Sequence, residues 1–436
     1  MNVTSRKLRR PAALVCSVVA GVGFLVGSVG ATGAPASAAR PSSQVYAVRG
    51  AAWQLAMATR AHAVGCDVAS PGRARCDLRV LKAPNARPRS GTTCPVDESS
   101  GYTACNVQNA YGLTSLAKKN GKGETVAVVD AYDDPNAEAD MDTYRSAEGL
   151  AACPSTNGCF QKVNQEGAAS PLPSPDAGAA QEISVDLDMV SAVCPKCHII
   201  LVEANSNGLG DLLSAVAESV QLGADVVSDS WGTGEFDGET RWDGDLNFPG
   251  IAITFSSGDG AYQGGVQYPS ASPYVTSVGG TMLTPVTKKG RQWKETAWVT
   301  PPTTKGAQPV QGSGSGCSAY EAKPAWQTDT GCAMRMPADV SAVAALVLSY
   351  DTYGGGSWFY SFGTSVSSPI VAGIYALAGN SASVTTPVSL AYANPTKFND
   401  ITAGSEGTCT PTYFCKAVKG YDGPTGLGSP KADGGF

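Results

Sequence analysis

From about Thr103 onward, short apolar runs rich in β-branched residues alternate with segments long enough to form helices. The expected strands are Thr125–Ala131, Ile199–Glu203, Asp225–Ser230, Ile251–Ser256 and Tyr274–Val278. Helices are expected between these strands at Asn136–Ala147, Gln181–Val193 and Leu209–Leu222. In the last of these segments apolar residues recur at helical spacing. Strands separated by helices predict an α/β fold in which helices cover both faces of a mainly parallel sheet.

The first 39 residues have the composition of a secretory signal peptide. A basic stretch at 6–10 precedes an apolar run from about Ala12 to Val29, and small residues follow at Ala36-Ser37-Ala38. This order is typical of an export signal. A membrane anchor is the alternative, but the run is glycine-rich, barely long enough to span a bilayer and followed by an Ala-x-Ala site. We therefore expect residues 1–39 to be removed from a secreted, extracellular protein.

Composition divides the rest of the 436 residues into two parts. Residues 40–93 are rich in Ala and Arg and end in a Pro- and Arg-containing stretch at 82–89. This composition predicts a short pro-segment followed by an exposed, cleavable linker. Residues 94–436 are numerous enough to bury the core of a single large domain. Within that domain, the polar region from about Thr284 to Thr330 is expected to form long surface loops.

Of the 13 cysteines, Cys16 belongs to the expected signal peptide, and the other 12 fall into neighbouring couples. An even number of cysteines in an exported chain favours disulfides that close short loops. Paired by proximity, the couples are Cys66/Cys76, Cys94/Cys105, Cys153/Cys159, Cys194/Cys197, Cys317/Cys332 and Cys409/Cys415. A zinc site at the Cys194/Cys197 couple is the alternative, but this couple lacks a second CxxC motif.

The charge of the chain argues against two classes of partner. The formal net charge is −6, and it becomes −10 (−6 − 4) when the signal peptide, with four basic and no acidic residues, is removed. We therefore do not expect binding to nucleic acid. No basic run remains that would attract the chain to an anionic membrane surface. After signal cleavage, no membrane partner is expected.

Gly363-Thr364-Ser365 precedes a run whose apolar residues recur at helical spacing, so Ser365 is expected at or just before the first turn of a buried helix. A serine at that place either caps the helix, which contributes about 1 kcal/mol, or acts as a nucleophile. A nucleophilic serine needs a base within hydrogen-bonding reach. The two histidines are His62, in the expected pro-segment, and His198, at the opening of a strand. A Ser-His-Asp triad is therefore poorly supplied with histidine.

Carboxylates are the remaining candidates for the base. Glu182 and Asp186 stand four residues apart on one expected helix, and this spacing places both on one face. A solvated acidic edge is the alternative, but the same face continues into apolar residues, and Asp188 on another face is expected to supply the exposed charge. Two carboxyl groups held close together share a proton, which raises one pKa. Such a pair can accept a proton from Ser365 in acid, where an imidazole would already be protonated.

Asp259 is a third acid of interest. It follows the expected strand Ile251–Ser256, within Ser257-Gly258-Asp259-Gly260. Because an aspartate beside glycine is a common turn residue, its position alone leaves a structural role open.

Taken together, these motifs resemble the sedolisin family of serine-carboxyl peptidases, relatives of subtilisin that work in acid. The resemblance covers about Thr103 to Lys431 and depends on the order and spacing of several short motifs. They are Val128–Pro135, Glu182–Asp186, Ser228–Gly232, Ser257–Asp259, Tyr268–Thr281 and Gly363–Ser365. The resemblance implies a subtilisin-like fold for a single large catalytic domain at 94–436, which would act as a monomer on protein or peptide substrates.

The resemblance also implies a role for each catalytic residue. Ser365 would be the nucleophile that forms an acyl-enzyme. Glu182 would be the general base and acid, and Asp186 would orient Glu182. Asp259 would complete the oxyanion hole, which requires a protonated carboxyl because only the neutral form has a hydrogen to donate.

A peptide-binding edge is implied as well. Ser230, Trp231 and Gly232 look like an extended edge that pairs with the backbone of a substrate. For Trp231, the alternative is a purely structural role in the core.

Near the C-terminus, the sequence resembles the calcium site of the same family. Two carboxylates and three main-chain carbonyls would give the oxygen-only ligation that suits one structural Ca²⁺ ion. The implied ligands are Asp400, Ile401, Val418, Gly420 and Asp422.

Two other functions stay open from the residues. One is a subtilisin-like Ser/His/Asp peptidase that uses Asp130 and a histidine. The other is a non-catalytic secreted relative that binds peptides without turnover.

Overall fold

The computed structural model describes residues 54–64, 70–86, 88, 94, 101–286, 291–300 and 311–436. All of these residues belong to one compact unit, Ser42–Phe436. The expected signal peptide lies outside the described residues. Among the residues that are described, no helix combines the length and the apolar character needed to cross a membrane.

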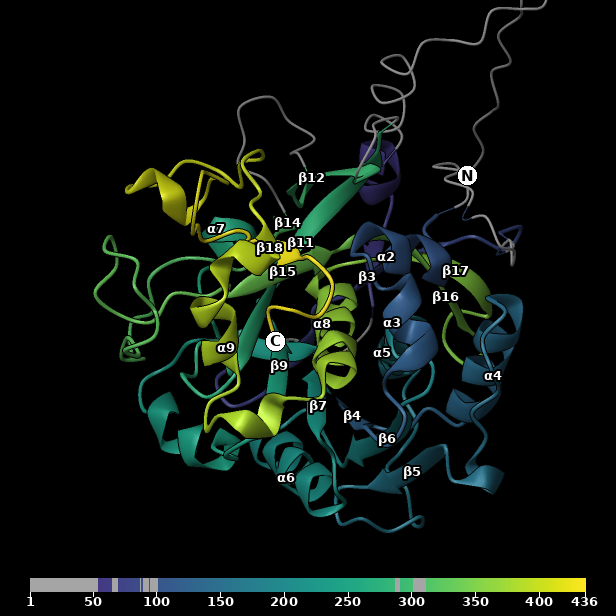
Figure 1. Ribbon diagram of the computed structural model, residues 1–436. Helices are drawn as coiled ribbons and strands as arrows, with labels where there is room; N and C mark the ends of the chain where they lie inside the picture. The colour runs from purple at the N-terminus through teal and green to yellow at the C-terminus, as the bar shows by residue number, and fades with distance from the viewer. Residues whose placement is uncertain are drawn as a thin grey trace, which may run out of the picture. The chain divides into compact units, whose positions relative to one another are not determined.

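An eight-stranded sheet forms the centre of this unit (Figure 1). Its strand order is β12-β11-β9-β7-β4-β6-β5, and β15 pairs with β11 outside this path. The bounds are β4 (Thr125–Ala131), β5 (Phe160–Asn164), β6 (His198–Ala204), β7 (Val226–Asp229), β9 (Ala252–Ser256), β11 (Thr276–Pro285), β12 (Trp293–Ala297) and β15 (Val340–Val343). Paired strands are parallel except β11 and β12. The expectation of a mainly parallel sheet in an α/β fold is confirmed.

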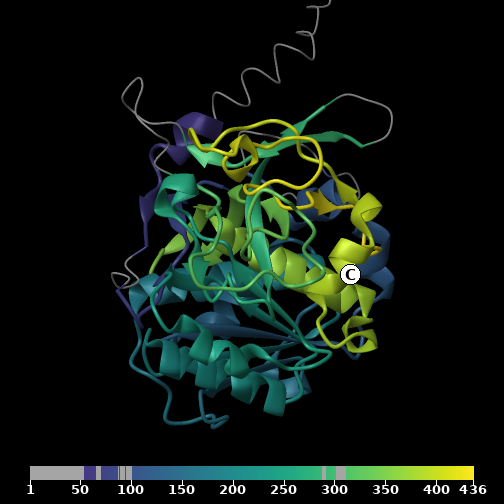
Figure 2. The same cartoon turned by 90° about the vertical axis from the view of Figure 1, so that its left-hand side faces the viewer.

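Helices cover both faces of the sheet. They are α2 (Ala104–Ala110), α3 (Thr114–Lys119), α4 (Ala137–Ala147), α5 (Ala177–Val193), α6 (Leu209–Gln221), α7 (Ala261–Gly264), α8 (Thr364–Ala378) and α9 (Val388–Ala393). α5 and α8 pack against each other and share a core with Val126 and Val128 of β4. α6 shares the opposite core with Ala127 and Val129, because successive residues of a strand point to opposite faces. In Figures 1 and 2, the teal α6 lies at the bottom and the yellow-green α8 nearer the centre.

Smaller sheets and short helices complete the fold. The remaining strands are β1 (His62–Ala63), β2 (Arg75–Cys76), β3 (Arg79–Lys82), β8 (Trp231–Gly234), β10 (Gln267–Tyr268), β13 (Val299–Thr300), β14 (Gln311–Gly312), β16 (Ala345–Asp351), β17 (Ser357–Phe362), β18 (Phe398–Asn399) and β19 (Ser429–Pro430). The described residues also form 3-10 helices at Ser155–Asn157, Glu239–Leu246, Ser381–Ser383, Pro395–Lys397 and Thr412–Phe414.

Two of the smaller sheets join the expected pro-segment to the rest of the unit. β1 and β3 extend the β17-β16 pair, and β2 extends the β10-β8 pair. Both β2 and β3 are antiparallel to their partners in the large domain. The stretch expected to be an exposed linker is partly buried, since Ala83 and Ala86 are only 7% and 9% exposed. The expectation is wrong at these positions because pairing with β17 holds the chain against the domain.

The structure also corrects the expected end of the last strand. That strand, placed at Tyr274–Val278, is β11, which continues to Pro285. Gly279 and Gly280 are therefore part of a strand, although two adjacent glycines are typical of a turn. Their neighbours explain the glycines, because a Cβ on Gly280 would lie 2.6 Å from the Cβ of Ala344.

The polar region after β11 is more ordered than expected. It contains β12, β13 and β14, and it buries Glu295 and Glu321. Glu295 accepts a hydrogen bond from the Thr281 hydroxyl at 2.7 Å. Such bonds let polar residues lie inside the protein, so the region is not simply surface loop.

Five of the six expected cysteine couples are disulfide-bonded. They are Cys94–Cys105, Cys153–Cys159, Cys194–Cys197, Cys317–Cys332 and Cys409–Cys415. Cys76 is disulfide-bonded as well, but Cys66 lies outside the described residues. The disulfide between Cys194 and Cys197 excludes the zinc alternative, because zinc binds thiolates.

Candidate active site

α5 carries the two carboxylates that the sequence predicts as the base. Asp176 caps this helix by accepting two hydrogen bonds from main-chain N–H groups of the first turn. Every residue from Gly178 to Val193 is buried, and Glu182 and Asp186 are both 0% exposed. Both carboxylates therefore point into the protein, which excludes the solvated acidic edge.

Asp188 on the same helix is buried too, which corrects the expectation of an exposed charge. It accepts a hydrogen bond from the main-chain N–H of Tyr350 at 2.9 Å. Burial raises the pKa of its carboxyl well above the ordinary value. The expectation failed because α5 is enclosed on several sides, by α2, α4, α8, β4 and β16.

Ser365 lies in the first turn of α8, but it does not cap the helix, because the N-cap is Gly363. The Ser365 hydroxyl donates to the main-chain oxygen of Ser230 at 3.3 Å. The side-chain hydroxyl of Ser230 in turn donates to Asp186 at 2.8 Å. Ser230 therefore connects the predicted nucleophile with the acidic helix.

Glu182 lies beside this connection, and neither of its carboxylate oxygens makes a hydrogen bond. Burial, followed by the negative charges of Asp186 and Asp130, raises the pKa of Glu182 well above its ordinary value. The nearby Ser365 hydroxyl has a smaller, lowering effect on this pKa. A buried carboxylate oxygen that has no partner and lies next to a hydroxyl is placed to take a proton from it.

Two further acids enlarge the cluster beyond the predicted residues. Asp130, considered from sequence only as a partner for histidine, lies near the end of β4, and Asp229 ends the adjacent parallel strand β7. Burial raises the pKa of both carboxyls well above the ordinary value, and the charge of Asp130 contributes at Asp229. Their position at the carboxyl ends of parallel strands is the sequence signal that could have identified them.

Asp259 follows β9 and faces the start of α8. Its Oδ1 accepts hydrogen bonds from the main-chain N–H and the hydroxyl of Thr364, at 2.8 and 3.0 Å. Its Oδ2 is buried and has no hydrogen-bond partner. Burial and the charge of Asp77 raise the pKa of Asp259 well above its ordinary value. A Cβ on Gly363 (φ 133°) would lie 2.7 Å from Oδ2, so glycine leaves this oxygen open toward the first turn of α8.

The predicted peptide-binding edge is the start of β8, and it pairs antiparallel with β2. The side chain of Trp231 points into the core, where its Nε1 donates to the main-chain oxygen of Val129 at 2.9 Å. Its ring meets Phe255 edge-on at a centroid distance of 4.9 Å. The side chain of Trp231 therefore has the structural role in the core, while its backbone pairs with β2.

The N-terminal part of the chain itself lies along this edge. The main-chain N–H of Asp77 donates to the Ser230 carbonyl at 3.3 Å. The main-chain N–H of Ser365 donates to the Asp77 carbonyl at 3.2 Å. A segment of the expected pro-segment is thus held along this edge in contact with Ser365.

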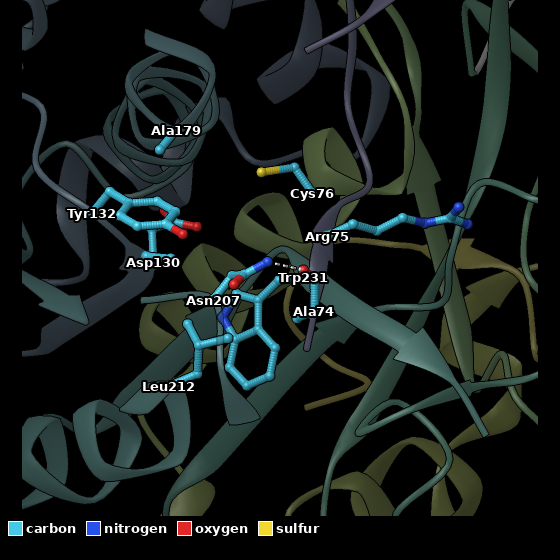
Figure 3. A pocket seen from close by; sticks show the side chains of 10 residues that line it. Ala74, Arg75, Cys76, Asp130, Tyr132, Ala179, Asn207, Leu212 and Trp231 are labelled. Atoms are coloured by element: carbon cyan, nitrogen blue, oxygen red, sulfur yellow. Dashed lines mark hydrogen bonds between the residues drawn. The ribbon is translucent and has the colours of Figure 1, made fainter. Parts of the chain in front are cut away.

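A cavity lies beside this segment (Figure 3). Asp130, Leu212 and Trp231 line it from the large domain, together with Ala74 and its neighbours from the N-terminal segment. The amide nitrogen of Asn207 donates to the Ala74 carbonyl at 2.8 Å. The cavity therefore lies between the segment and the domain.

The structure does not bring His198 to this site. His198 opens β6 opposite Thr125, whereas Glu203 near the other end of β6 lies opposite Asp130. Five residues of strand span about 17 Å. His198 is exposed, and its Nδ1 lies 2.9 Å from the carbonyl oxygen of Gly158. It is therefore at the amino end of the sheet, away from the acidic cluster.

The predicted calcium ligands lie on two neighbouring loop segments. Burial, together with the charge of Asp400, raises the pKa of Asp422 to about 7. The main-chain N–H of Gly420 donates to Asp400 at 3.1 Å, and that of Val418 donates to Asp422 at 2.9 Å. Two adjacent carboxylates with main-chain oxygens in the same loops fit a hard cation such as Ca²⁺.

A second acidic cluster was not predicted, because Asp351 is far from Asp134 and Asp140 in the sequence. Oxygens of Asp134, Asp140 and Asp351 lie within 4.8 Å of one another. The loop after β16 donates hydrogen bonds to two of these carboxylates. The main-chain N–H of Thr352 donates to Asp140 at 2.7 Å, and that of Gly354 donates to Asp351 at 2.8 Å.

Comparisons with known proteins identify the family that this chain is similar to. A model of the subtilase family matches residues 174–395, about half of the chain. Kumamolisin of Bacillus sp. (strain MN-32) is 26% identical over 403 residues, which are 84% of this chain and 68% of kumamolisin. Sedolisin of Pseudomonas sp. (strain 101) is 28% identical over 385 residues, 81% of this chain and 62% of sedolisin. The chain thus spans about two thirds of the length of these curated relatives.

Among solved structures, a match is Pseudomonas sedolisin, a serine-carboxyl proteinase, complexed with two molecules of pseudo-iodotyrostatin. The two are 25% identical, with a TM-score of 0.64. The match covers 76% of this chain and 96% of the solved one.

Proposed function

Because the chain belongs to the subtilase family and, within it, to the sedolisin type of serine peptidase, we propose that it is a secreted serine-carboxyl endopeptidase that cleaves proteins in acid. The observation that carries this proposal is the burial of Glu182 and Asp186 beside Ser365. Its substrates are proteins or peptides, whose backbone pairs with the edge at Ser230, Trp231 and Gly232.

In the proposed reaction, Ser365 attacks the carbonyl carbon of the scissile bond while Glu182 accepts the hydroxyl proton. Asp186, whose carboxylate accepts a hydrogen bond from the Ser230 hydroxyl, acts on Glu182 through its charge, which raises the pKa of Glu182. Glu182 then passes the proton to the leaving amine, and a water molecule releases the acyl group. The cluster titrates as a unit, so it can carry one negative charge in acid while its other members stay protonated.

The role of Asp259 sets the proposed pH dependence. Its pKa is raised, so the carboxyl keeps a proton at pH values where an ordinary aspartate is ionised. The protonated form can donate a hydrogen bond to the oxyanion, and the ionised form cannot. Activity is therefore retained in acid and lost as the pH rises through the pKa of Asp259 in the folded protein.

Burial and position favour this mechanism over the alternatives. A Ser/His/Asp peptidase would need a histidine at the carboxyl ends of the strands, and His198 lies at the other end of β6. A non-catalytic peptide-binding relative would not need the buried acids, whose desolvation is costly. Their retention beside Ser365 supports catalysis.

We expect Ser365→Ala to abolish cleavage, because the acyl-enzyme of the proposed reaction forms on the Ser365 hydroxyl. The measurement is hydrolysis of a denatured protein substrate by wild type and variant over a pH range from acid to neutral. Wild type should cleave in acid and progressively less toward neutral pH. Equal cleavage by the two proteins would contradict the proposal.

The remaining parts of the chain fit a secreted precursor. We propose residues 1–39 as the signal peptide, 40–93 as the pro-segment and linker, and 94–436 as the peptidase domain of a monomeric enzyme. The disulfides support export, because such bonds persist in oxidising compartments.

We also propose that Asp400, Asp422 and the main-chain oxygens of Ile401, Val418 and Gly420 hold one structural Ca²⁺. The ion would neutralise the two adjacent carboxylates and tie the loop after β18 to the loop before β19. It takes no part in the chemistry.

Removal of calcium should therefore destabilise the fold. We expect EDTA to lower the Tm of the Ser365→Ala protein, and added Ca²⁺ to restore it, because a ligand that binds only the folded state stabilises it. Asp422→Asn should abolish this response to calcium, whereas Asp433→Asn, outside the loop, should retain it. A Tm of the Ser365→Ala protein that does not change with EDTA or calcium would contradict the site.

A further inference from the structure

The N-terminal segment pairs with two strands of the large domain, as the backbone of a substrate would. β2 pairs with β8, with Arg75 opposite Gly232, and β3 pairs with β17, with Arg79 opposite Phe362. Both pairings are antiparallel, and the chain between them contacts Ser365 through the Asp77 carbonyl. The two residues between β2 and β3 are Asp77 and Leu78.

The bond between Asp77 and Leu78 is the one presented to the nucleophile. The Asp77 carbonyl accepts a hydrogen bond from the main-chain N–H of Ser365 at 3.2 Å. A Cβ on Gly363 would lie 2.1 Å from the same carbonyl oxygen, so glycine is required for this close approach. A carbonyl held by the amide of the nucleophile is in the position of the carbonyl that is attacked.

The side chain of Asp77 enters a pocket in the large domain. It is 1% exposed, and its Oδ2 accepts a hydrogen bond from the Ser256 hydroxyl at 3.0 Å. The side-chain amide of Gln267 also donates to the Asp77 carboxylate, at 3.0 Å. This distance applies to the amide orientation in which both its nitrogen and its oxygen have hydrogen-bond partners. Gly232 and Gly258 leave room for the side chain of Gln267. A Cβ on Gly232 would lie 2.4 Å from this side chain, and a Cβ on Gly258 would lie 2.6 Å from it.

We propose that the pocket formed by Ser256 and Gln267, between Gly232 and Gly258, selects an acidic side chain on the residue whose carbonyl is attacked. This inference rests on the proposed function and names its substrate class: peptides with Asp or Glu before the scissile bond. The chain's own Asp77–Leu78 bond is then the first substrate of the enzyme.

The chemistry of the pocket supports an acid and disfavours other side chains. A hydroxyl and a carboxamide can donate to a carboxylate, and they can also accept from a carboxylic acid. Burial is the main cause that raises the pKa of Asp77, so the protonated form persists in acid. An apolar side chain would leave both polar groups without partners, and loss of such bonds is costly in a buried site.

In the self-cleavage step, Ser365 Oγ forms a bond to the carbonyl carbon of Asp77 as its proton passes to Glu182. The bond to the nitrogen of Leu78 breaks, and this nitrogen takes the proton from Glu182. Water then hydrolyses the ester, which frees Ser365 and leaves Asp77 as a new C-terminal carboxylic acid. No oxidant or further reactant is needed.

The test compares peptides that differ only at the residue before the scissile bond, with Asp, Glu, Leu or Lys at that position. We expect kcat/KM at acid pH to be at least about 10-fold higher for Asp or Glu than for Leu or Lys. Gln267→Leu should reduce the ratio of kcat/KM for the Asp peptide to kcat/KM for the Leu peptide. Gln161→Leu, the same change at an exposed position on β5, should leave the ratio as in wild type.

Self-cleavage provides a second readout, because acidified wild-type precursor should acquire Leu78 as a new N-terminus. Ser365→Ala should not, and Asp77→Leu should do so more slowly. Cleavage that depends on Ser365 but shows no acidic preference, or avoids the Asp77–Leu78 bond, would overturn this inference and leave the proposed function intact. Cleavage unaffected by Ser365→Ala would instead overturn the proposed function.

Discussion

Glu182→Gln is expected to lower kcat/KM by on the order of 10⁴-fold while the protein stays folded. Glutamine has the same shape as glutamate and is neutral, so it can occupy the buried position but cannot accept the proton of Ser365. The change also removes one carboxyl from a cluster in which burial and mutual repulsion raise the pKa values. Stability should therefore not fall, which separates a catalytic effect from a structural one.

Two control variants make this result specific. Asp188→Asn replaces another fully buried acid on the same helix, and its amide oxygen can still accept the hydrogen bond from Tyr350. His198→Gln removes the histidine of the large domain. Both should retain activity close to wild type in the acid assay. Near-complete loss of activity in His198→Gln, with activity retained in Glu182→Gln, would instead support a histidine-dependent peptidase.

The second large effect concerns stability, which is expected to fall as the pH rises from acid to mildly alkaline. Burial raises the pKa of Glu148 and of Glu203 to about 8, and that of Asp134 to about 7. In the unfolded chain these groups ionise near pH 4. Between about pH 4 and about pH 8 the folded state therefore binds more protons than the unfolded state, so raising the pH favours unfolding. The stability of the fold is therefore greatest at pH values below the pKa that these groups have in the unfolded chain. This extra stability is lost as the pH rises through the pKa that they have in the folded protein.

Thermal unfolding of the Ser365→Ala protein checks this expectation without self-digestion. With calcium held constant, the Tm should fall by about 5–10 °C between about pH 4.5 and about pH 8, equivalent to several kcal/mol. Glu148→Gln should make the fall smaller, because the glutamine cannot ionise. Glu166→Gln, at an exposed position, should not change it. A Tm that rises over this range would contradict the account.

Local patterns predicted the parts of the fold that depend on local sequence. The spacing of apolar residues located α6 to within one residue of its end, and β4 at its full length. The four-residue spacing of Glu182 and Asp186 placed both on one face of α5, because helical geometry alone decides this. The same reasoning failed for Asp188, since a helix enclosed on several sides has no solvent face and periodicity assumes one.

Features that depend on distant contacts were not accessible from local patterns. The place of Asp77 beside Ser365 depends on pairing with strands more than 150 residues away in the sequence. Two adjacent glycines, Gly279 and Gly280, are typical of a turn, and only their neighbours in the fold explain their presence in a strand. Asp130 and Asp229 join the cluster because β4 and β7 are adjacent in the sheet, and strand order is a tertiary property.

The most direct test of the central claim, that carboxylates and not a histidine handle the proton of Ser365, is the pH dependence of acylation in a single turnover. We predict that the rate of acyl-enzyme formation is highest in acid, declines as the pH rises, and is lost in Glu182→Gln at every pH. A rate that instead rises with pH through about 6.5, the pKa of an ordinary imidazole, and persists in Glu182→Gln would contradict the account.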